Sequence, residues 1–533
     1  MLRSGQNRQH HTGMNKDHGL IASHPLGEQP PVVPTPDSAV PVDTYAGRID
    51  VAWEPDAAVT PLGQVPFFIE YLKQAGLFDS LVAGCPIQYT SPNAPSKRDL
   101  LGTVLLSILS GHWRYAHITA LRADKVTPPL LGMRRVLSED AVRRGLAKID
   151  PVAGAAWLQE NLDYVTRPLL REPWILDVDT TVKPLFGHQQ GAVVGSNPGK
   201  PGRPSHSYHS YLIANLRLVL DVEVHDGNQT ASKHGAPGLW AMLDRLGRDC
   251  WPALLRGDTD WGNEAVMREA EQRELAYLFR IRLTANVRRA IERAVNGLWS
   301  DAGHGWQGQS IHLRLDGWGR QRRVVLLRRK LEGPLAISEQ DASGQQVLSF
   351  ATVDARKQVW EYGALVTATD AEILTLGQAY RDRADCENDF DEFKNQWGWA
   401  GFTTQDRNRC QLMARSVALV ANWWNLFARL ADPDHHREAI TSRPLLLTAI
   451  GRQTTHAGRT TLHVSSSHGR HRWARQAFAR IAGFFAQLRQ SAEQLTALDR
   501  WYRILSQALV KYLHGRQLDP PRRIQPAGAT AMG

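Results

Sequence analysis

Residues 174–179 read Trp-Ile-Leu-Asp-Val-Asp, and at this stretch the helical pattern of the preceding chain changes into a pattern of strands. The stretch follows Pro173, and a short apolar run bounded by a turn residue predicts a strand. Residues 208–216 and 218–224 predict two more strands, which should be antiparallel neighbours because almost nothing separates them.

The elements that follow complete the pattern of one sheet. A helix is predicted at residues 234–246, a strand at 252–258, a helix at 263–273 and a strand at 277–282. The predicted order is three strands, a helix, a strand, a helix and a strand. This is the order of an RNase H-like mixed sheet, so we expect an α/β fold. Fold order alone does not give a function.

The rest of the chain divides around this core. Composition rich in Pro, His, Gly and Gln predicts a disordered N-terminal tail, and Ser96 and Ser138 are expected to cap helices after it. The expected segments are a disordered tail at 1–60, a helical N-terminal region at 61–170, the first part of the core at 171–295, a β-rich insertion at 296–369, the second part of the core at 370–430, a C-terminal helical region at 431–520 and a second tail at 521–533.

Arginines cluster around the helix that Ser138 is expected to cap. They are Arg134, Arg135, Arg143 and Arg144. Such a cluster is found both on solvated helix faces and on helices that contact DNA, and the sequence leaves these two interpretations open.

Composition limits the class of protein. The chain has 533 residues, more than one hydrophobic core accommodates, so several domains are expected. A net charge of +10 favours a polyanionic partner such as nucleic acid, because neutralising phosphates releases counterions. No apolar run is long enough to span a membrane, and the four cysteines form no paired motif. We therefore expect a cytoplasmic protein without a membrane partner.

Two aspartates end predicted strands of the sheet. Asp179 ends the first, and Asp258 ends the fourth, where Gly257 leaves room for a close backbone approach. Carboxylates that converge at strand ends suit the hard divalent cations that support phosphodiester chemistry. Asp177 is an alternative to Asp179, because residues two apart in a strand share a face, and Asp260 is an alternative to Asp258.

A third carboxylate is expected on a helix predicted at residues 370–394. At about 100° per residue, Tyr380, Arg383, Glu387 and Lys394 fall on one narrow stripe of that helix. Asp391 falls near the same stripe and stays open as an alternative ligand. An exposed ion pair between Arg383 and Glu387 is the competing interpretation of the pattern.

The spacing of these four residues resembles the YREK signature of insertion-sequence transposases with a DDE active site. Four separated stretches are similar to one subgroup of that family, and the resemblance covers roughly residues 60–430. The stretches are Leu176-Asp-Val-Asp179-Thr-Thr-Val-Lys, Asn197-Pro-Gly-Lys-Pro-Gly-Arg-Pro-Ser-His206, Asn215-Leu-Arg-Leu-Val-Leu-Asp-Val-Glu223 and Arg256-Gly-Asp258.

The resemblance implies an RNase H-like core that is interrupted by a β-rich insertion between Asp258 and Glu387. It implies that Glu387 binds metal with the two aspartates, and that Tyr380, Arg383 and Lys394 hold phosphates near the cleaved bond.

In related enzymes a tryptophan of the insertion receives a flipped base. Trp360 is our candidate, and Trp299, Trp306 and Trp318 are its alternatives.

The loop at residues 188–206 carries Lys200 and Arg203 among glycines and prolines, and the resemblance favours a DNA contact there over a solvated crossover. His188, His206 and His209 lack a fourth ligand, so their spacing does not indicate a zinc site.

Taken with the resemblance, the sequence predicts a DNA transposase. We expect two Mg²⁺ ions per site, with Mn²⁺ as a substitute, and cleavage at terminal inverted repeats followed by strand transfer. The expected partners are double-stranded DNA and a second copy of the chain on that DNA, which would associate the protein with the nucleoid. A DNA-binding protein with a decayed core, and an RNase H-like nuclease without strand transfer, are the alternatives.

Overall fold

Strand β4 (Ile175–Pro184) is the centre of the core sheet in the computed structural model of the chain. On one side β4 pairs antiparallel with β6 (Pro204–Ile213), which pairs antiparallel with β7 (Leu218–Asp226). On the other side β4 pairs parallel with β8 (Leu254–Gly257), and β8 pairs parallel with β9 (Tyr277–Arg280). The order β7-β6-β4-β8-β9 confirms the RNase H-like mixed sheet.

The structure describes residues 39–197, 199–331, 350–353, 359–465, 468–491 and 495–521, and at residues 350–353 and 384–387 it describes the backbone alone. The chain divides into two compact units, Met1–Ala57 and Ala58–Gly533. The sheet, the helices and every candidate site residue belong to the second unit.

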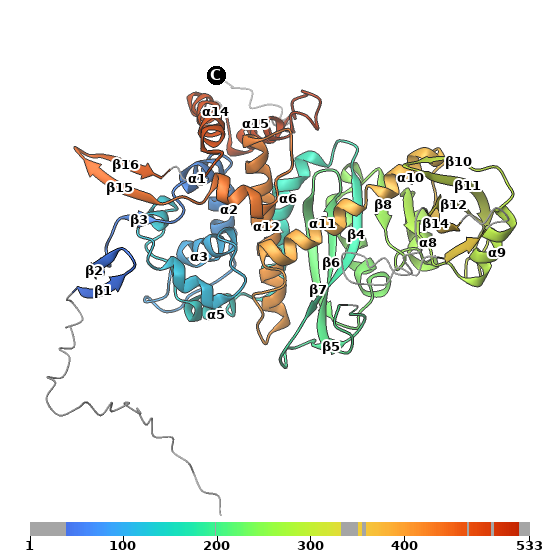
Figure 1. The fold of residues 1–533 in the computed structure, drawn as a ribbon, viewed down its shortest axis with the longest axis horizontal. Coiled ribbons are helices and arrows are strands. Elements are labelled where there is room, and N and C mark those ends of the chain that lie inside the picture. The colour runs from blue at the N-terminus through green and yellow to red at the C-terminus, as the bar shows by residue number, and fades with distance from the viewer. Residues whose placement is uncertain are drawn as a thin grey trace, which may run out of the picture. The chain divides into compact units, whose positions relative to one another are not determined.

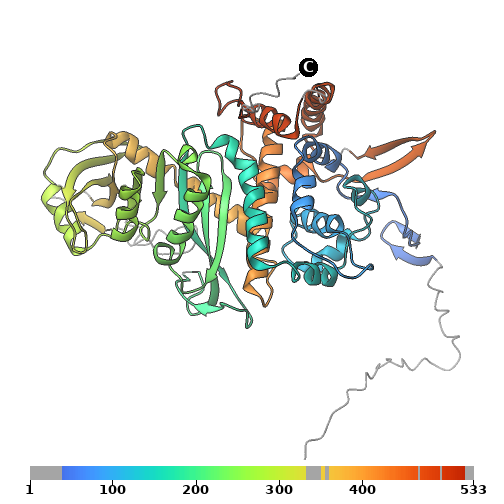
Figure 2. The same cartoon turned by 180° about the vertical axis from the view of Figure 1, so that it is seen from behind.

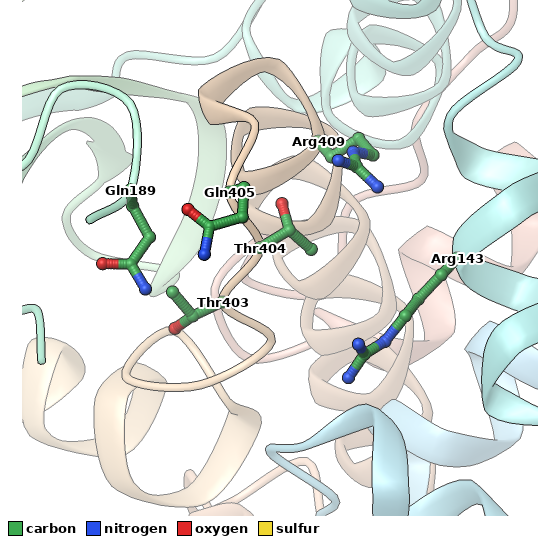
Figure 3. A pocket seen from close by; sticks show the side chains of 6 residues that line it. All are labelled: Arg143, Gln189, Thr403, Thr404, Gln405 and Arg409. Atoms are coloured by element: carbon green, nitrogen blue, oxygen red, sulfur yellow. The ribbon is translucent and has the colours of Figure 1, made fainter. Parts of the chain in front are cut away.

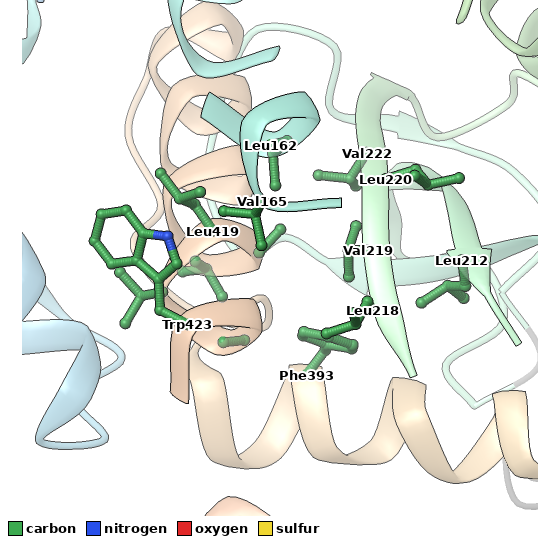
Figure 4. Close-up of a cluster of buried hydrophobic side chains, with 14 of the residues drawn as sticks. Leu162, Val165, Leu212, Leu218, Val219, Leu220, Val222, Phe393, Leu419 and Trp423 are labelled. Carbon is green, nitrogen blue, oxygen red and sulfur yellow. The ribbon is translucent and has the colours of Figure 1, made fainter. Parts of the chain in front are cut away.

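Helices α6 (Pro151–Thr166) and α12 (Arg407–Ala431) pack against β7 and against each other. Figure 4 shows this contact, in which Leu162 and Val165 of α6 meet Leu419 and Trp423 of α12 beside the valines and leucines of β7. Fully burying one such aliphatic side chain contributes about 1.5–3 kcal/mol, so this interface holds the central strands in place.

Strands β10 to β14 lie in the segment that was expected to be a β-rich insertion. They are β10 (Ser300–Gly303), β11 (Trp306–Leu313), β12 (Arg322–Lys330), β13 (Phe350–Val353) and β14 (Val359–Thr367). Strand β14 pairs antiparallel with β9 through Leu365 and Arg280, so the insertion continues the core sheet and does not form a separate one (Figure 1).

The single helix predicted at residues 370–394 is wrong, because the chain breaks there. Helix α10 (Ile373–Arg381) ends at a turn through Asp382 and Arg383, and α11 (Ala384–Glu392) continues into a π-helical turn at Phe393–Trp397. Arg381 donates to the Ala302 carbonyl of β10 at 2.6 Å, whereas the π-helical turn packs on α12 and α13 (Ala439–Leu446). The break lets each half pack on a different part of the fold.

The remaining helices surround the core. Ser96 caps α3 by accepting from the Asp99 amide at 3.0 Å, and Ser138 caps α5 through Ala141, as predicted. Their bounds are α1 (Val65–Gln74), α2 (Leu77–Gly84), α3 (Lys97–Leu109), α4 (Thr127–Leu130), α5 (Glu139–Leu146), α7 (Ala236–Leu246), α8 (Glu264–Gln272), α9 (Ala285–Ala294), α14 (His471–Gln490) and α15 (Ala497–Ala508). Among the residues that the structure describes, no helix is long and apolar enough to cross a membrane.

Two segments expected to lack strands contain hairpins. In the segment expected to be a disordered tail, β1 (Val40–Thr44) pairs with β2 (Gly47–Val51), because Gly47 adopts the positive φ that the turn requires. Residues 1–38 and 522–533, where tails were also expected, lie outside the described part.

In the segment expected to be purely helical, β15 (Gly451–His456) pairs with β16 (Arg459–Val464). The run of β-branched threonines there favours strands over helix. The two short strands β3 (Val59–Thr60) and β5 (Val193–Val194) complete the fold.

Candidate active site

Asp179 and Asp258 lie side by side at the edge of the core sheet where β8 ends. The prediction that Asp179 ends its strand is wrong, because β4 continues to Pro184 through its pairing with β6, whereas Asp258 directly follows β8. Val178 of β4 is paired with Gly257 of β8, so the next residue of each parallel strand is an aspartate. Neighbouring strands are about 4.8 Å apart, which brings the two carboxylates together. Burial, and after it the charge of Asp179, raises the pKa of Asp258 to about 6. The site therefore holds two negative charges that repel each other.

Glycines on both sides of Asp258 allow neighbouring chain segments to pack closely against the turn after β8, as the sequence predicted. A Cβ atom at Gly257 would lie 2.7 Å from the Cβ of Trp261, a fully buried side chain, and one at Gly262 would meet the backbone of Arg280. The turn after β8 is further closed by the Asp260 amide, which donates to the Asp258 carboxylate at 3.0 Å. This packing fixes the Asp258 carboxylate at the strand end.

Asp177 forms an ion pair with Arg256, although it shares a strand face with Asp179. Arg256 donates to both Asp177 oxygens at 2.6 Å, and it also donates to the Ala379 carbonyl of α10. Asp177 and Arg256 are both almost completely buried. The pair holds β4, β8 and α10 together, and this contact leaves Asp179 as the aspartate of β4 that lies beside Asp258.

Asp260 lies closer to solvent than Asp258. Its side chain is 42% exposed and pairs with Arg282 at 2.9 Å. Of the two aspartates after β8, Asp258 is the one that faces Asp179.

Arg383 donates to Asp179 from the turn between α10 and α11. Both side chains are largely buried, at 7% exposure for Arg383 and 13% for Asp179. The amide of Thr180 also donates to Asp179, at 2.7 Å. The helix break described above therefore places the guanidinium directly on the first carboxylate.

Tyr380 and Lys394 lie within electrostatic reach of the same carboxylates. Burial raises the pKa of the Tyr380 phenol, and Arg383, Asp258 and Asp179 are among the charges that act on it. Burial lowers the pKa of the Lys394 ammonium, and Asp391 and Asp179 oppose that shift. Arg383 thus contacts Asp179, and the charge of Asp179 acts on both Tyr380 and Lys394.

Glu387, the fourth, lies on α11 four residues after Arg383, but its side chain is outside the described residues. Other acidic residues of α11 have different surroundings. Asp391 is exposed and accepts from Asn395 at 2.6 Å, and Asp389 pairs with Arg217 at 3.4 Å. Glu392 is buried against His436 and the Ala439 amide. These contacts do not favour Asp391 as the third ligand.

The donor set fits a divalent cation. Two adjacent carboxylates repel each other when both are ionised, and a positive ion between them would reduce this repulsion. Carboxylate oxygens are the ligands that Mg²⁺ prefers. Within the described residues no three metal-ligating side chains form a cluster, and Glu387 is the candidate for the third.

Trp360 lies beyond the same edge of the sheet. Strand β14 runs antiparallel to β9, and its Leu365 pairs with Arg280, the last residue of β9. Trp360 lies five residues before Leu365 in β14. At about 3.3 Å per residue it stands about 17 Å past that strand end, on the side where Asp258 lies. Arg328 stands over its ring, with the guanidinium carbon 4.4 Å from the centroid.

The alternative tryptophans differ in burial. Arg328 also stands over Trp299, at 4.2 Å, and Arg329 stands over Trp306, at 5.1 Å. Trp318 is only 8% exposed, which leaves little of its ring for a base.

Lys200 and Arg203 share an aromatic partner that sequence analysis missed. Both cations stand over the ring of Phe186, each 4.9 Å from its centroid, and Phe186 is 70% exposed. An exposed phenylalanine flanked by cations offers a flat apolar face and positive charge at one place. The signal in the sequence was an aromatic residue just after a strand, in a loop rich in cations.

The histidines near this loop are engaged in hydrogen bonds to backbone carbonyls. His206 and His209 are buried, and their rings lie 2.8 Å from the Gln190 carbonyl and 3.2 Å from the Gln229 carbonyl. His188 is exposed. His206 and His209 thus each contact the backbone of a neighbouring loop.

A polar pocket of about 210 Å³ contains one of the arginines that the sequence left undecided. Figure 3 shows Arg143 of α5 and Arg409 of α12 pointing toward the same space, beside threonines and glutamines from two loops. Arg143 thus lines a polar recess, where its guanidinium carbon lies 5.0 Å from the centroid of the Tyr115 ring and Arg409 pairs with Asp406 at 3.1 Å. Its lining residues are Arg143, Gln189, Thr403, Thr404, Gln405 and Arg409.

The family described as Transposase DDE domain group 1 matches residues 68–485, which is most of the chain. A cryo-EM structure of the piggyBac transposase synaptic complex with hairpin DNA is similar at 10% identity and a TM-score of 0.36, covering 84% of this chain and 86% of that chain. No curated protein sequence matches.

Proposed function

The chain belongs to the family Transposase DDE domain group 1, and from this premise we propose that it cuts DNA at the terminal inverted repeats of its own insertion sequence and joins the freed strands to target DNA. The observation that carries this proposal is the pair of adjacent, partly buried aspartates on neighbouring parallel strands, Asp179 within β4 and Asp258 directly after β8, with Arg383 on the first of them.

Asp179, Asp258 and Glu387 are the proposed catalytic carboxylates and metal ligands. They would hold two divalent cations, Mg²⁺ with Mn²⁺ as a substitute, and such a pair activates the attacking oxygen and stabilises the leaving one. The raised pKa of Asp258 supports this role, because the site favours a neutral or metal-bound carboxyl over a bare anion.

Tyr380, Arg383 and Lys394 are proposed to hold the phosphates around the cleaved bond. Arg383 neutralises Asp179 in this structure, and on DNA its planar guanidinium would turn to a phosphate, which it can bind in a bidentate manner. Burial lowers the pKa of Lys394 and raises that of Tyr380, and the charge of Asp179 acts on both, which supports a position for both side chains near the proposed site.

Trp360, Lys200 and Arg203 are proposed to contact DNA outside the reacting bond. Trp360 would stack on a displaced base, with Arg328 beside it, and base stacking on an aromatic ring contributes about 1–3 kcal/mol. Lys200 and Arg203 would bind the phosphate backbone. Two element ends must be held together for transfer, so we propose that two copies of the chain assemble on the DNA.

One assay separates this proposal from a decayed DNA-binding protein and from a nuclease. Purified protein is incubated with Mg²⁺, a labelled duplex of the element end taken from the DNA that flanks the gene, and a supercoiled plasmid. Cleavage with insertion of the label into plasmid is the expected result. Binding alone or cleavage alone would overturn the proposal in favour of the corresponding alternative.

The carboxylates are tested in the same assay. Glu387→Gln, Asp179→Asn and Asp258→Asn should each abolish cleavage and retain binding to the duplex. Asp260→Asn is the matched control, since that residue is exposed and paired with Arg282, and it should keep cleavage. Cleavage at the wild-type rate by Glu387→Gln would contradict the assignment of that residue.

A further inference from the structure

The hairpin β15–β16 projects from the helical end of the second unit (Figures 1 and 2). Its turn consists of Ala457 and Gly458, both with positive φ, which is the backbone conformation that matches the twist of two antiparallel strands. At its base the hairpin is anchored to β3, where Gly451 pairs with Thr60 and Arg452 with Val59. The residues from Gln453 onward in β15 extend beyond β3.

The two faces of this hairpin differ in chemistry. Residues opposite each other in an antiparallel pair share a face, and so do residues two apart in one strand. One face, which we call the basic face, therefore carries only hydrogen-bonding or cationic side chains: Arg452, Thr454, His456, Arg459, Thr461 and His463. The opposite face carries Gln453, Leu462 and two threonines.

The basic face is open to solvent. Arg452, His456, Arg459, Thr461 and His463 are exposed. Neither Arg452 nor Arg459 has an ion-pair partner among the residues that the structure describes. Their charges are therefore available to a partner.

The surrounding sequence has an unusual charge. Between Glu438 and Glu493 the chain contains eight arginines and four histidines but no aspartate or glutamate. Several of these arginines, Arg470, Arg472 and Arg475 among them, are exposed at the beginning of α14. A segment with only positive charge binds a polyanion and repels a copy of itself.

We propose that the basic face of the β15–β16 hairpin binds double-stranded DNA by lying in its major groove. The major groove, about 12 Å wide, admits a two-stranded ribbon, and a strand of six residues is about 20 Å long. Arg452 and Arg459 bind phosphates on the groove walls, and the threonine and histidine side chains face the base edges. This inference rests on the proposed action on DNA, and it adds a contact on an element separate from the aspartate pair.

The test is equilibrium binding to a labelled duplex of mixed sequence, about three helical turns long, over a range of salt concentrations. The double variant Arg452→Gln/Arg459→Gln should lower the slope of log K against log salt by about 1.8, because each lost phosphate contact removes about 0.9. On the same basis, affinity at 0.1 M salt should fall by about 60-fold. Arg452→Lys/Arg459→Lys keeps both charges and should restore the slope.

Two controls distinguish the hairpin from a general loss of charge or shape. Arg503→Gln/Lys511→Gln removes the same charge from exposed positions on and after α15 and should leave the slope nearly unchanged. Thr455→Ala/Thr460→Ala alters the opposite face of the same hairpin and should bind like the wild type. A duplex whose cytosines carry glucosylated hydroxymethyl groups, which fill the major groove, should bind the wild type more weakly.

Several results would overturn the inference. They are an unchanged salt slope in Arg452→Gln/Arg459→Gln, equal wild-type affinity for the duplex with a filled major groove, and a change in oligomeric state without a change in affinity for DNA. The last would identify the hairpin as a contact between two copies of the chain. None of these depends on cleavage, so failure of the element-end assay with wild-type protein would refute the proposed function and leave the binding result intact.

Discussion

Replacing Asp258 by asparagine should stabilise the metal-free protein. The folded state holds the Asp258 carboxyl with a pKa of about 6, against an ordinary value of 3.8, because burial and the charge of Asp179 oppose its ionisation. One pKa unit corresponds to about 1.36 kcal/mol, so ionising Asp258 costs the folded state up to about 3 kcal/mol. Asparagine has a similar shape and carries no charge, which removes that cost.

The sign of the pH dependence follows from the raised pKa. Between 3.8 and about 6 the folded state binds more protons than the unfolded state, so the wild type loses stability as the pH rises through this window. Asp258→Asn should therefore exceed the wild type by up to about 3 kcal/mol near pH 7.5, and the difference should shrink toward pH 4.5.

Urea denaturation in a metal-chelating buffer at about pH 7.5 and about pH 4.5 measures this difference. Asp260→Asn is the matched control and should change the free energy of unfolding by less than about 0.5 kcal/mol, since an exposed ion pair contributes little. Adding Mg²⁺ should stabilise the wild type more than Asp258→Asn. Equal or lower stability of Asp258→Asn near pH 7.5 without metal would refute the reasoning.

Three further outcomes are expected. Arg256→Met leaves Asp177 buried without its bidentate partner and should lower the free energy of unfolding by about 3–5 kcal/mol in urea, with part of the loss recovered in a variant that also carries Asp177→Leu. Lys200→Ala/Arg203→Ala should weaken duplex binding and reduce the salt slope by about 1.8, and an unchanged slope would remove both from the DNA contact. Trp360→Ala should slow cleavage of an intact element end more than cleavage of an end with unpaired bases, as measured in single-turnover reactions, and equal slowing on both substrates would exclude base stacking there.

Much of the core could be predicted from the sequence because its signals are local. Short apolar runs separated by turn residues define the strands around residues 174–282, and their order leaves few topologies open. The chemistry of the site was also visible, since two predicted strands carry aspartates and the spacing from Tyr380 to Lys394 resembles a known signature, although β4 continues past Asp179 to Pro184. Asp179 and Asp258 were named on this basis, and the structure brings them together.

Other features depended on contacts between segments distant in the chain. Asp177 and Asp179 occupy equivalent positions in a strand pattern, and only the approach of Arg256 from β8 separates a buried structural carboxylate from one at the site. The break between α10 and α11 likewise follows from packing on β10 and α12, against a continuous helical periodicity.

The sequence by itself therefore determined the order of the strands and the presence of aspartates on two of them, because hydrophobic periodicity and turn residues act over a few neighbouring positions. Tertiary structure decided which aspartate is neutralised by Arg256, where the helix after β14 breaks, and that residues 451–464 form an exposed hairpin. These outcomes depend on contacts between segments that are far apart in the sequence. The free energy of a buried ion pair depends on the distance between its charges, and only the folded chain defines that distance.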